Sequence, residues 1–243
     1  MDIQRLYSHV RRAIYDYNMI EDGDKIAIGI SGGKDSLTLL YALAGLRKFY
    51  PKSFELCAIS VDLGYEGFDL SPIKSLCEEL EVPYYIVSSE IKDILEIKIP
   101  DPDKAPCSLC AKLRKGALNE KALELGCNKI AYAHHKDDLI ETAFLSLLYE
   151  GRFHCFSPVT PLVRSGLTLI RPLLYVTEAE VIGFRNKYQL PCVKNPCPYD
   201  GNTKREYVKN LIRQIQLENP GAKNRIFNAV ITGNLEGWPR NER

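Results

Sequence analysis

Apolar and polar positions in this chain follow two different periods, one helical and one strand-like, in alternation. Leu6, Val10, Ala13 and Tyr17 recur at helical spacing and predict an amphipathic helix over residues 3–20. The next apolar run, residues 25–30, is short and continuous, which is typical of a strand covered on both faces. The expected strands are residues 25–30, 54–61, 83–88, 129–133 and 167–170. The expected helices are residues 35–47, 71–80, 108–126, 137–149 and 177–188, with two more within 203–233.

Strands that alternate with helices predict an α/β, Rossmann-like fold. In it, a mostly parallel sheet has helices on both faces, followed by C-terminal helices. We expect three parts: an N-terminal helix in 1–22, a nucleotide-binding and catalytic domain in 23–190, and a C-terminal cysteine loop with a helical tail in 191–243. Two Pro-rich loops, 90–106 and 191–202, interrupt the alternation. Because parallel sheets bind ligands beyond the carboxyl ends of their strands, the loops there are the first places to look for chemistry.

Composition narrows the class of protein. The chain has 243 residues, of which 45% are apolar and 26% charged, as in an ordinary folded protein. No apolar run approaches the roughly 18–20 residues of a membrane span, and the N-terminus lacks the basic-then-apolar order of a secretory signal. We therefore expect a cytoplasmic protein with no membrane partner. The net charge of +1 argues against a grip on nucleic acid by the whole surface, but allows a local patch.

The loop between the first expected strand and the helix after it carries the strongest motif. It reads Gly29-Ile30-Ser31-Gly32-Gly33-Lys34-Asp35-Ser36. Adjacent glycines allow a tight turn, two serines add hydroxyl groups, Lys34 adds a positive charge, and the helix start adds its dipole, so the loop suits phosphate. The Walker A pattern fails because Asp35 follows Lys34, and the dinucleotide pattern fails because Ser31 stands at its second glycine. The structural alternative is a tight strand–helix turn with Asp35 as a first-turn carboxylate.

This loop resembles the S-G-G-x-D-S signature of the PP-loop ATP pyrophosphatases. The resemblance implies an adenine nucleotide alpha hydrolase type of fold and an enzyme that splits ATP between its α and β phosphates. It also implies a nucleotide site made of three loops. Its residues are Gly29, Ile30, Ser31, Gly32, Gly33, Lys34, Asp35 and Ser36, then Val61 and Asp62, then Ala133, His134 and Asp138.

Eight cysteines in an expected reducing compartment suggest metal binding or catalysis where they cluster. Cys107 and Cys110 lie three residues apart at a helix start, where thiolates are favoured. Cys197 follows far along the chain. A C-x-x-C motif alone also fits a redox dithiol or half of a zinc site. Four further cysteines are expected to be buried fillers: Cys57, Cys77, Cys127 and Cys155.

Together with the nucleotide loop, a second set of motifs resembles the tRNA 2-thiocytidine biosynthesis family and, more distantly, the tRNA 2-thiouridine enzymes. These motifs are Cys107-Ser108-Leu109-Cys110, Arg114-Lys115-Gly116, residues 133–138 and Glu141-Thr142. The resemblance implies ATP, Mg²⁺ and a [4Fe–4S] cluster held by Cys107, Cys110 and Cys197, with Cys192 as the rival third ligand. It implies that the catalytic residues are Lys34, Asp62, Arg114 and Asp138.

The activity so implied is an ATP-dependent tRNA sulfurtransferase that adenylates a pyrimidine C2 carbonyl and replaces its oxygen by sulfur. The implied partners are tRNA, through an anticodon-loop pyrimidine, and a sulfur donor such as a cysteine desulfurase or free sulfide; a homodimer is compatible. Candidate RNA contacts are Lys112, Arg114, Lys115, Lys121, Lys204, Arg205, Lys209, Arg213, Lys223 and Arg225. The alternatives are a PP-loop ligase or amidotransferase with structural zinc, a nucleobase desulfurase, and a non-catalytic RNA-binding module.

Overall fold

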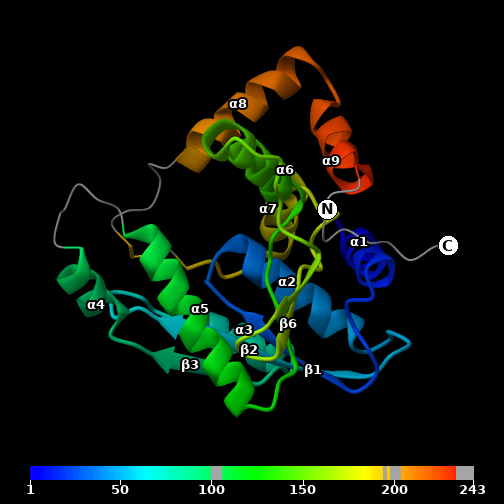
Figure 1. Cartoon of the computed structure of the whole chain (residues 1–243). Coiled ribbons are helices and arrows are strands. Elements are labelled where there is room, and N and C mark those ends of the chain that lie inside the picture. Colours follow the sequence, from blue (N-terminus) through cyan, green and yellow to red (C-terminus); the bar gives the residue numbers. More distant parts are fainter. Residues whose placement is uncertain (100–105, 194–195, 198–203, 234–243) are drawn as a thin grey trace.

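The chain folds into one twisted sheet between two layers of helices (Figure 1). The structure is a computed structural model that describes residues 1–99, 106–193, 196–197 and 204–233. The strands in these ranges are β1 (Asp24–Gly29), β2 (Phe54–Asp62), β3 (Tyr84–Ser88), β4 (Lys129–Ala131), β5 (Val159–Leu162) and β6 (Leu167–Ile170). The helices are α1 (Ile3–Asp16), α2 (Lys34–Leu46), α3 (Ser71–Glu79), α4 (Ile91–Lys98), α5 (Cys107–Glu124), α6 (Lys136–Leu145), α7 (Glu178–Tyr188), α8 (Lys204–Glu218) and α9 (Ala222–Thr232), with a π-helical turn η1 (Ser146–Glu150).

The sheet confirms the predicted mostly parallel α/β fold. Its order is β3-β2-β1-β4-β6-β5. β1 pairs in parallel with β2 and β4, so that Gly29 at the end of β1 lies opposite Ile59 of β2. β3 and β6 are also parallel to their neighbours, and β5 is antiparallel at the edge. The carboxyl ends of β1, β2, β4 and β6 therefore meet along one edge of the sheet.

Two apolar cores cover the two faces of the sheet. Alternate residues of β1 point to opposite sides, so Ile26 and Ile28 join one core and Ala27 joins the other. The first core contains buried residues of α1, α2, α3, α6 and α7, and also Val208 of α8 and Phe227 of α9. The second, smaller core lies under α4 and α5. Across the described ranges, no helix combines the length and the apolarity that spanning a bilayer demands.

The structure differs from the sequence-based expectation in two segments. Residues 91–98, expected within a loop, form α4, because Ile91 and Leu95 lie one turn apart and bury themselves on the second core. Residues 159–162, for which no strand was expected, form β5. A proline inside a short strand argues against a central position, but Pro161 is tolerated here because β5 lies at the edge of the sheet.

The last helix, α9, is joined to the start of α6 by an ion pair. Lys223 of α9 lies 2.7 Å from a carboxylate oxygen of Asp137, which is only 6% exposed. The second oxygen of Asp137 accepts the backbone N–H of Glu178 at 2.7 Å. Burial raises the pKa of Asp137, but the hydrogen bonds from Lys223 and from the Glu178 backbone outweigh it, so the pKa lies below its usual value.

We expect Lys223→Ala to lower the free energy of unfolding by about 2 kcal/mol at pH 7. The variant leaves a buried carboxylate without its counter-charge; the loss stays below the roughly 3–5 kcal/mol of a fully buried pair because water reaches Lys223. Because the pKa of Asp137 is lowered in the folded state, its contribution is present above the unfolded pKa of about 3.9 and is lost in acid. Urea unfolding should therefore show a gap in the free energy of unfolding between the unmodified protein and Lys223→Ala, and this gap should narrow as the pH falls. A gap that does not depend on pH would contradict this assignment.

Candidate active site

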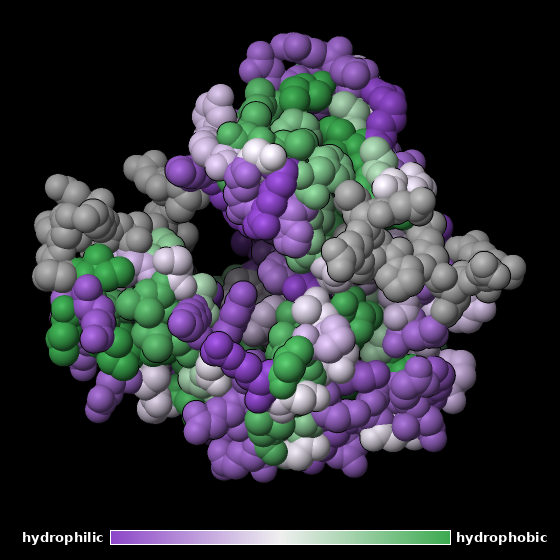
Figure 2. Space-filling view, in the orientation of Figure 1, coloured by the Kyte–Doolittle hydropathy of each residue, from purple (hydrophilic) through white to green (hydrophobic). Residues whose placement is uncertain are grey.

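A cavity of about 630 Å³ opens where the strands β1, β2 and β4 end. Figure 2 shows the surface hollowed between the part formed by α4 and α5 and the part formed by α6, η1 and α8. Of the residues predicted to form the site, those that line the cavity are Gly29, Ile30, Ser31, Gly33, Asp35, Ser36, Val61, Asp62, Arg114, Ala133, His134 and Asp138. The three loops named from the sequence therefore face one space, together with Arg114 of α5.

Hydroxyl groups of the first loop hold its turn in shape. The backbone N–H of Ser31 donates to Ser36 Oγ at 3.2 Å, and the N–H of Gly33 donates to Ser31 Oγ at 3.3 Å. Ser36 Oγ in turn donates to the Gly33 carbonyl at 3.0 Å. Gly32 has a positive φ of 82°, a conformation that L side chains rarely adopt, which explains a glycine there. The amides and hydroxyls at the start of α2 thus form a preorganised cradle for an anion.

Five predicted residues do not line the cavity: Lys34 and Gly32 of the phosphate loop, and the cysteines Cys107, Cys110 and Cys197. Lys34 is held to the side by two carboxylates, Asp35 at 3.1 Å and Glu178 at 3.4 Å. Gly32 is covered by Val193: the N–H of Val193 donates to the Gly32 carbonyl at 3.0 Å. This hydrogen bond brings the segment after α7 over the loop, and Val193 and Pro196 then contribute to the cavity wall.

Asp62 and Asp138 reach the cavity from two different strand ends. Asp62 ends β2, and its Oδ1 accepts the N–H of Gly64 at 3.0 Å. Asp138 belongs to a capping box with His135 at the start of α6: His135 Nδ1 accepts from the Asp138 N–H at 3.3 Å, and Asp138 Oδ2 accepts from the His135 N–H at 2.9 Å. His135 is the N-cap of this helix, and its hydrogen bonds with Asp138 hold that residue at the cavity.

Cys107 and Cys110 lie in the first turn of α5, one turn before Arg114. Burial raises the pKa of the Cys110 thiol; Arg114 opposes the rise, and the thiols of Cys197 and Cys107 add to it. Three thiols from two distant parts of the chain therefore lie near enough to act on one another electrostatically. They sit beside the cavity, because Arg114 and Pro196, their neighbours along the chain, line it.

Cys192 has different surroundings. Partial burial raises the pKa of its thiol, and the charged groups that act on it are Arg185, Asp35 and Lys34. These groups belong to the phosphate loop and α7, whereas Cys110 responds to Cys107, Cys197 and Arg114. Among the two candidates for a third thiol, Cys197 is therefore the one that shares an environment with Cys110.

The kind of metal site can be judged from the same thiols. In the part of the chain that the structure describes, no three or more His, Cys, Asp or Glu side chains gather as ligands of one metal ion. A single tetrahedral zinc needs thiolate sulfurs about 3.8 Å apart, since each Zn–S bond is about 2.3 Å. A [4Fe–4S] cluster is a larger body and takes thiolates that stand further apart. Cys107, Cys110 and Cys197 supply three neighbouring thiols, which are the ligands that such a cluster takes.

The other four cysteines are buried, as the sequence predicted. Cys57 and Cys127 belong to the second core, where their sulfurs lie 3.5 Å apart, and Cys77 and Cys155 belong to the first. Burial raises the pKa of Cys77 to about 12 and of Cys155 to about 11, so both stay protonated near neutral pH. These thiols fill core space.

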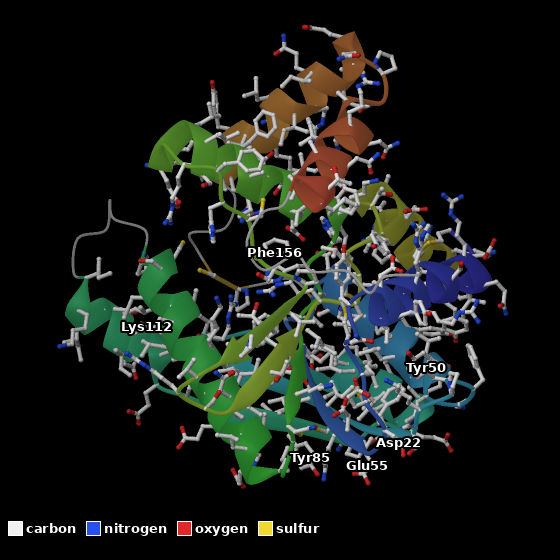
Figure 3. All side chains as sticks on the ribbon, turned by 45° about the vertical axis from the view of Figure 1, so that its right-hand side comes forward. Asp22, Tyr50, Glu55, Tyr85, Lys112 and Phe156 are labelled. Atoms are coloured by element: carbon white, nitrogen blue, oxygen red, sulfur yellow. The ribbon has the colours of Figure 1, made fainter. Side chains whose placement is uncertain are left out.

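Three of the six cations predicted for RNA in the last two helices are engaged with acidic groups of the protein. The three ion pairs are Arg205 with Glu141 at 3.0 Å, Lys209 with Glu178 at 2.7 Å and Lys223 with Asp137 at 2.7 Å. On α5, Lys121 pairs with Glu124 at 2.8 Å. Among the described residues, the exposed cations left without an ion pair include Lys112, Arg114 and Lys115 of α5, of which Arg114 and Lys115 line the cavity. Lys112 is labelled in Figure 3.

The sequence reading missed several residues of this site. His135 orients Asp138 and lies 3.6 Å from Asp35; Glu178 binds Lys34; Arg171 donates to His134. Tyr65, Phe68 and Tyr132 add aromatic surface to the cavity. Only the histidine pair gave a signal in the sequence. Glu178 begins α7 and Arg171 follows β6, and no motif near either residue in the sequence indicates a role in this site.

Comparison with known proteins agrees with this geometry. A family model described as a PP-loop domain matches residues 5–218. The tRNA-cytidine(32) 2-sulfurtransferase of Geobacter sulfurreducens is 37% identical over 235 residues, which cover 96% of this chain and 90% of that protein. The protein of the same name from Geotalea uraniireducens is 39% identical over 93% of this chain and 90% of its own. The U34-tRNA thiolase NcsA from Methanococcus maripaludis, solved with its [4Fe–4S] cluster, superposes with a TM-score of 0.76 at 27% identity over 97% of this chain and 80% of that one. The chain belongs to the PP-loop domain family and, within it, to the family of the tRNA-cytidine(32) 2-sulfurtransferases.

Proposed function

We propose that this protein is an ATP-dependent tRNA sulfurtransferase that converts a cytidine of the anticodon loop, cytidine 32, to 2-thiocytidine. The observation that carries the proposal is that a phosphate-binding loop lines the cavity and that three thiols, from α5 and residue 197, act on one another beside it. The names of the relatives support the choice of cytidine 32 over another base. Tyr65, Phe68 and Tyr132 offer aromatic faces against which a base turned out of the loop can stack.

The first half of the reaction makes the C2 oxygen of the base into a leaving group. That oxygen attacks the α-phosphorus of ATP, the bond between the α-phosphorus and the bridging oxygen breaks, and pyrophosphate departs with the bond's electrons. The hydroxyls of Ser31 and Ser36 and the N-terminus of α2 hold the departing pyrophosphate, and Lys34 neutralises its charge after leaving Glu178. Mg²⁺ would accompany ATP and neutralise phosphate charge, and Asp62, a carboxylate that lines the cavity from β2, would hold it.

The second half replaces oxygen by sulfur. A sulfide nucleophile forms a bond to C2, the C2–O bond breaks, and AMP leaves with the former base oxygen. No external electrons are required, because sulfide enters at the oxidation level that the thiocarbonyl retains. A [4Fe–4S] cluster held by Cys107, Cys110 and Cys197 would supply this sulfide from the iron that no cysteine binds. Arg114, one turn from Cys110, lines the cavity where it can balance the charge of the adenylated base.

The proposal is tested with protein purified without oxygen, ATP, sulfide and a tRNA transcript. We expect pyrophosphate release that depends on the tRNA, together with 2-thiocytidine in the digested RNA by mass spectrometry. A transcript with uridine at position 32 should give neither. Pyrophosphate release with incorporation of ammonia would favour a ligase, and loss of sulfur from a pre-thiolated tRNA without ATP would favour a desulfurase. Either result would contradict the proposal.

We expect the exposed cations of α5 to contact the RNA. We expect Lys112→Ala to weaken binding of an anticodon stem-loop about threefold to tenfold, and to lower the salt dependence of binding by about one phosphate contact. Lys121→Ala is the matched control on the same helix, because Lys121 is engaged with Glu124. Fluorescence anisotropy at several salt concentrations measures both. Equal losses in the two variants would contradict this placement of the RNA.

A further inference from the structure

Arg171, the residue after β6, is a buried cation that no carboxylate neutralises among the described residues. It is 6% exposed. Its Nη1 donates to the Ser157 carbonyl and, at 2.9 Å, to Thr160 Oγ1. Its guanidinium lies 4.9 Å from the centre of the Phe156 ring. Burial lowers the pKa of Arg171 to about 10, so the group is still charged at neutral pH. Burying a charge without a partner of opposite sign is costly, so the position calls for a role.

The remaining contact of Arg171 determines where His134 holds its proton. Arg171 Nε lies 3.2 Å from His134 Nδ1. A guanidinium N–H can only donate, so Nδ1 must accept, and the neutral imidazole carries its proton on Nε2. Stacking on Phe156, with ring centres 5.0 Å apart, and an edge contact with Tyr132 hold the ring in its plane. In Figure 3, Phe156 lies between the sheet and α6.

His134 is also kept neutral by its surroundings. Burial, and after it the charge of Arg171, lower the pKa of His134 to about 4. The other charged groups that act on it are Asp138 of α6, which raises the pKa, and Arg205 of α8 and Lys115 of α5, which lower it. With Nδ1 engaged and Nε2 protonated, the ring has no free lone pair to act as a base. What it presents to the cavity that it lines is one N–H donor.

The geometry points to a charge-assisted donor: Arg171, through His134, directs an Nε2–H group at an oxygen that carries or develops negative charge in the cavity. This inference rests on the proposed function for the identity of that oxygen, which belongs either to the α-phosphate of ATP or to C2 of the pyrimidine. The buried positive charge behind the ring polarises the imidazole and strengthens its donor. Donors fixed in advance toward developing charge stabilise transition states more than ground states. Arg171 is then a positioning residue, and His134 is the group that touches the ligand.

The first experiment is a ¹⁵N NMR titration of histidine-labelled full-length protein. We expect His134 in the Nε2–H form, without titration between pH 5.5 and pH 8. In Arg171→Met, which removes both donor and charge, the pKa of His134 should rise toward its usual value and the Nδ1–H form should appear. Arg171→Gln, which keeps a donor without the charge, should preserve the Nε2–H form. An Nδ1–H form in the unmodified protein would overturn the inference, whether or not any variant folds.

The second experiment measures function with His134→Phe, which retains an aromatic ring for stacking, and His134→Gln, which restores an N–H donor. We expect His134→Phe to lower kcat for RNA-dependent pyrophosphate release by about 100-fold, with partial recovery in His134→Gln.

Binding of a non-hydrolysable ATP analogue, without RNA, shows whether the oxygen that His134 contacts belongs to the nucleotide or to the base. A matching loss of analogue affinity assigns the oxygen to the nucleotide, whereas unchanged affinity assigns the donor to charge that develops during adenylation. Rates and affinities within twofold of the unmodified protein would overturn the inference. If the unmodified protein releases no pyrophosphate with any tRNA, the proposed function fails, while the NMR and analogue binding still decide the role of His134.

Discussion

Replacing Cys110 by serine is expected to abolish 2-thiocytidine formation and to leave less than one tenth of the iron and acid-labile sulfide of the unmodified protein. The hydroxyl of serine is a poor ligand for iron, and Cys110 shares its environment with both Cys107 and Cys197. ATP binding should survive, because the phosphate loop lies on other elements, β1 and α2. Iron and sulfide analysis after anaerobic purification, together with titration of an ATP analogue, measures the two properties separately.

The matched control is Cys192→Ser. Cys192 lies near Arg185, Asp35 and Lys34 and not in the group around Cys110, so the variant should keep its iron. Cys107→Ser and Cys197→Ser should lose their iron, as Cys110→Ser does. If Cys192→Ser loses iron while Cys197→Ser retains it, Cys192 is the third ligand, and the assignment made here from the surroundings of the thiols is wrong.

The second large effect is expected from Lys34→Met. Removing this charge should lower RNA-dependent pyrophosphate release by about 10²–10³-fold, the usual loss for a group that stabilises charge in the transition state. The unmodified structure holds Lys34 between Asp35 and Glu178, and the greater negative charge of a triphosphate draws the ammonium into the cavity. Single-turnover release of radiolabelled pyrophosphate is the measurement, with thermal unfolding to confirm that the variant is folded.

Lys48→Met serves as the control for Lys34→Met, because Lys48 is an exposed lysine that pairs with Glu81 across 3.6 Å, away from the cavity. It should leave pyrophosphate release unchanged. A loss in Lys34→Met smaller than threefold would mean that Lys34 remains with Glu178 during the reaction and has a structural role only. The loop would then hold pyrophosphate with its amides and hydroxyls alone.

Local patterns were sufficient for most of the fold. The strand β1, the loop after it and the start of α2 could be predicted because a buried run, two glycines and a first-turn acid lie next to one another along the chain. The same holds for α7, at whose start Thr177 and Glu180, three residues apart, form a capping box. Segments that depend on distant partners were harder. β5 exists because β6 offers it an edge, and α4 because α5 and β2 leave an apolar surface for Ile91 and Leu95.

The candidate site divides in the same way. The sequence alone was sufficient to identify the phosphate loop, the paired cysteines and the histidine pair, because each of these motifs acts through residues that are neighbours in sequence. Which thiol joins Cys110, which acid holds Lys34 and which cation stands behind His134 are set by contacts between elements far apart along the chain. The pairing of Arg205, Lys209 and Lys223 with carboxylates is set in the same way, since a charged side chain looks the same in a sequence whether a carboxylate or water faces it. Local spacing constrains the backbone near a residue, whereas burial and charge depend on what the folded chain brings against it.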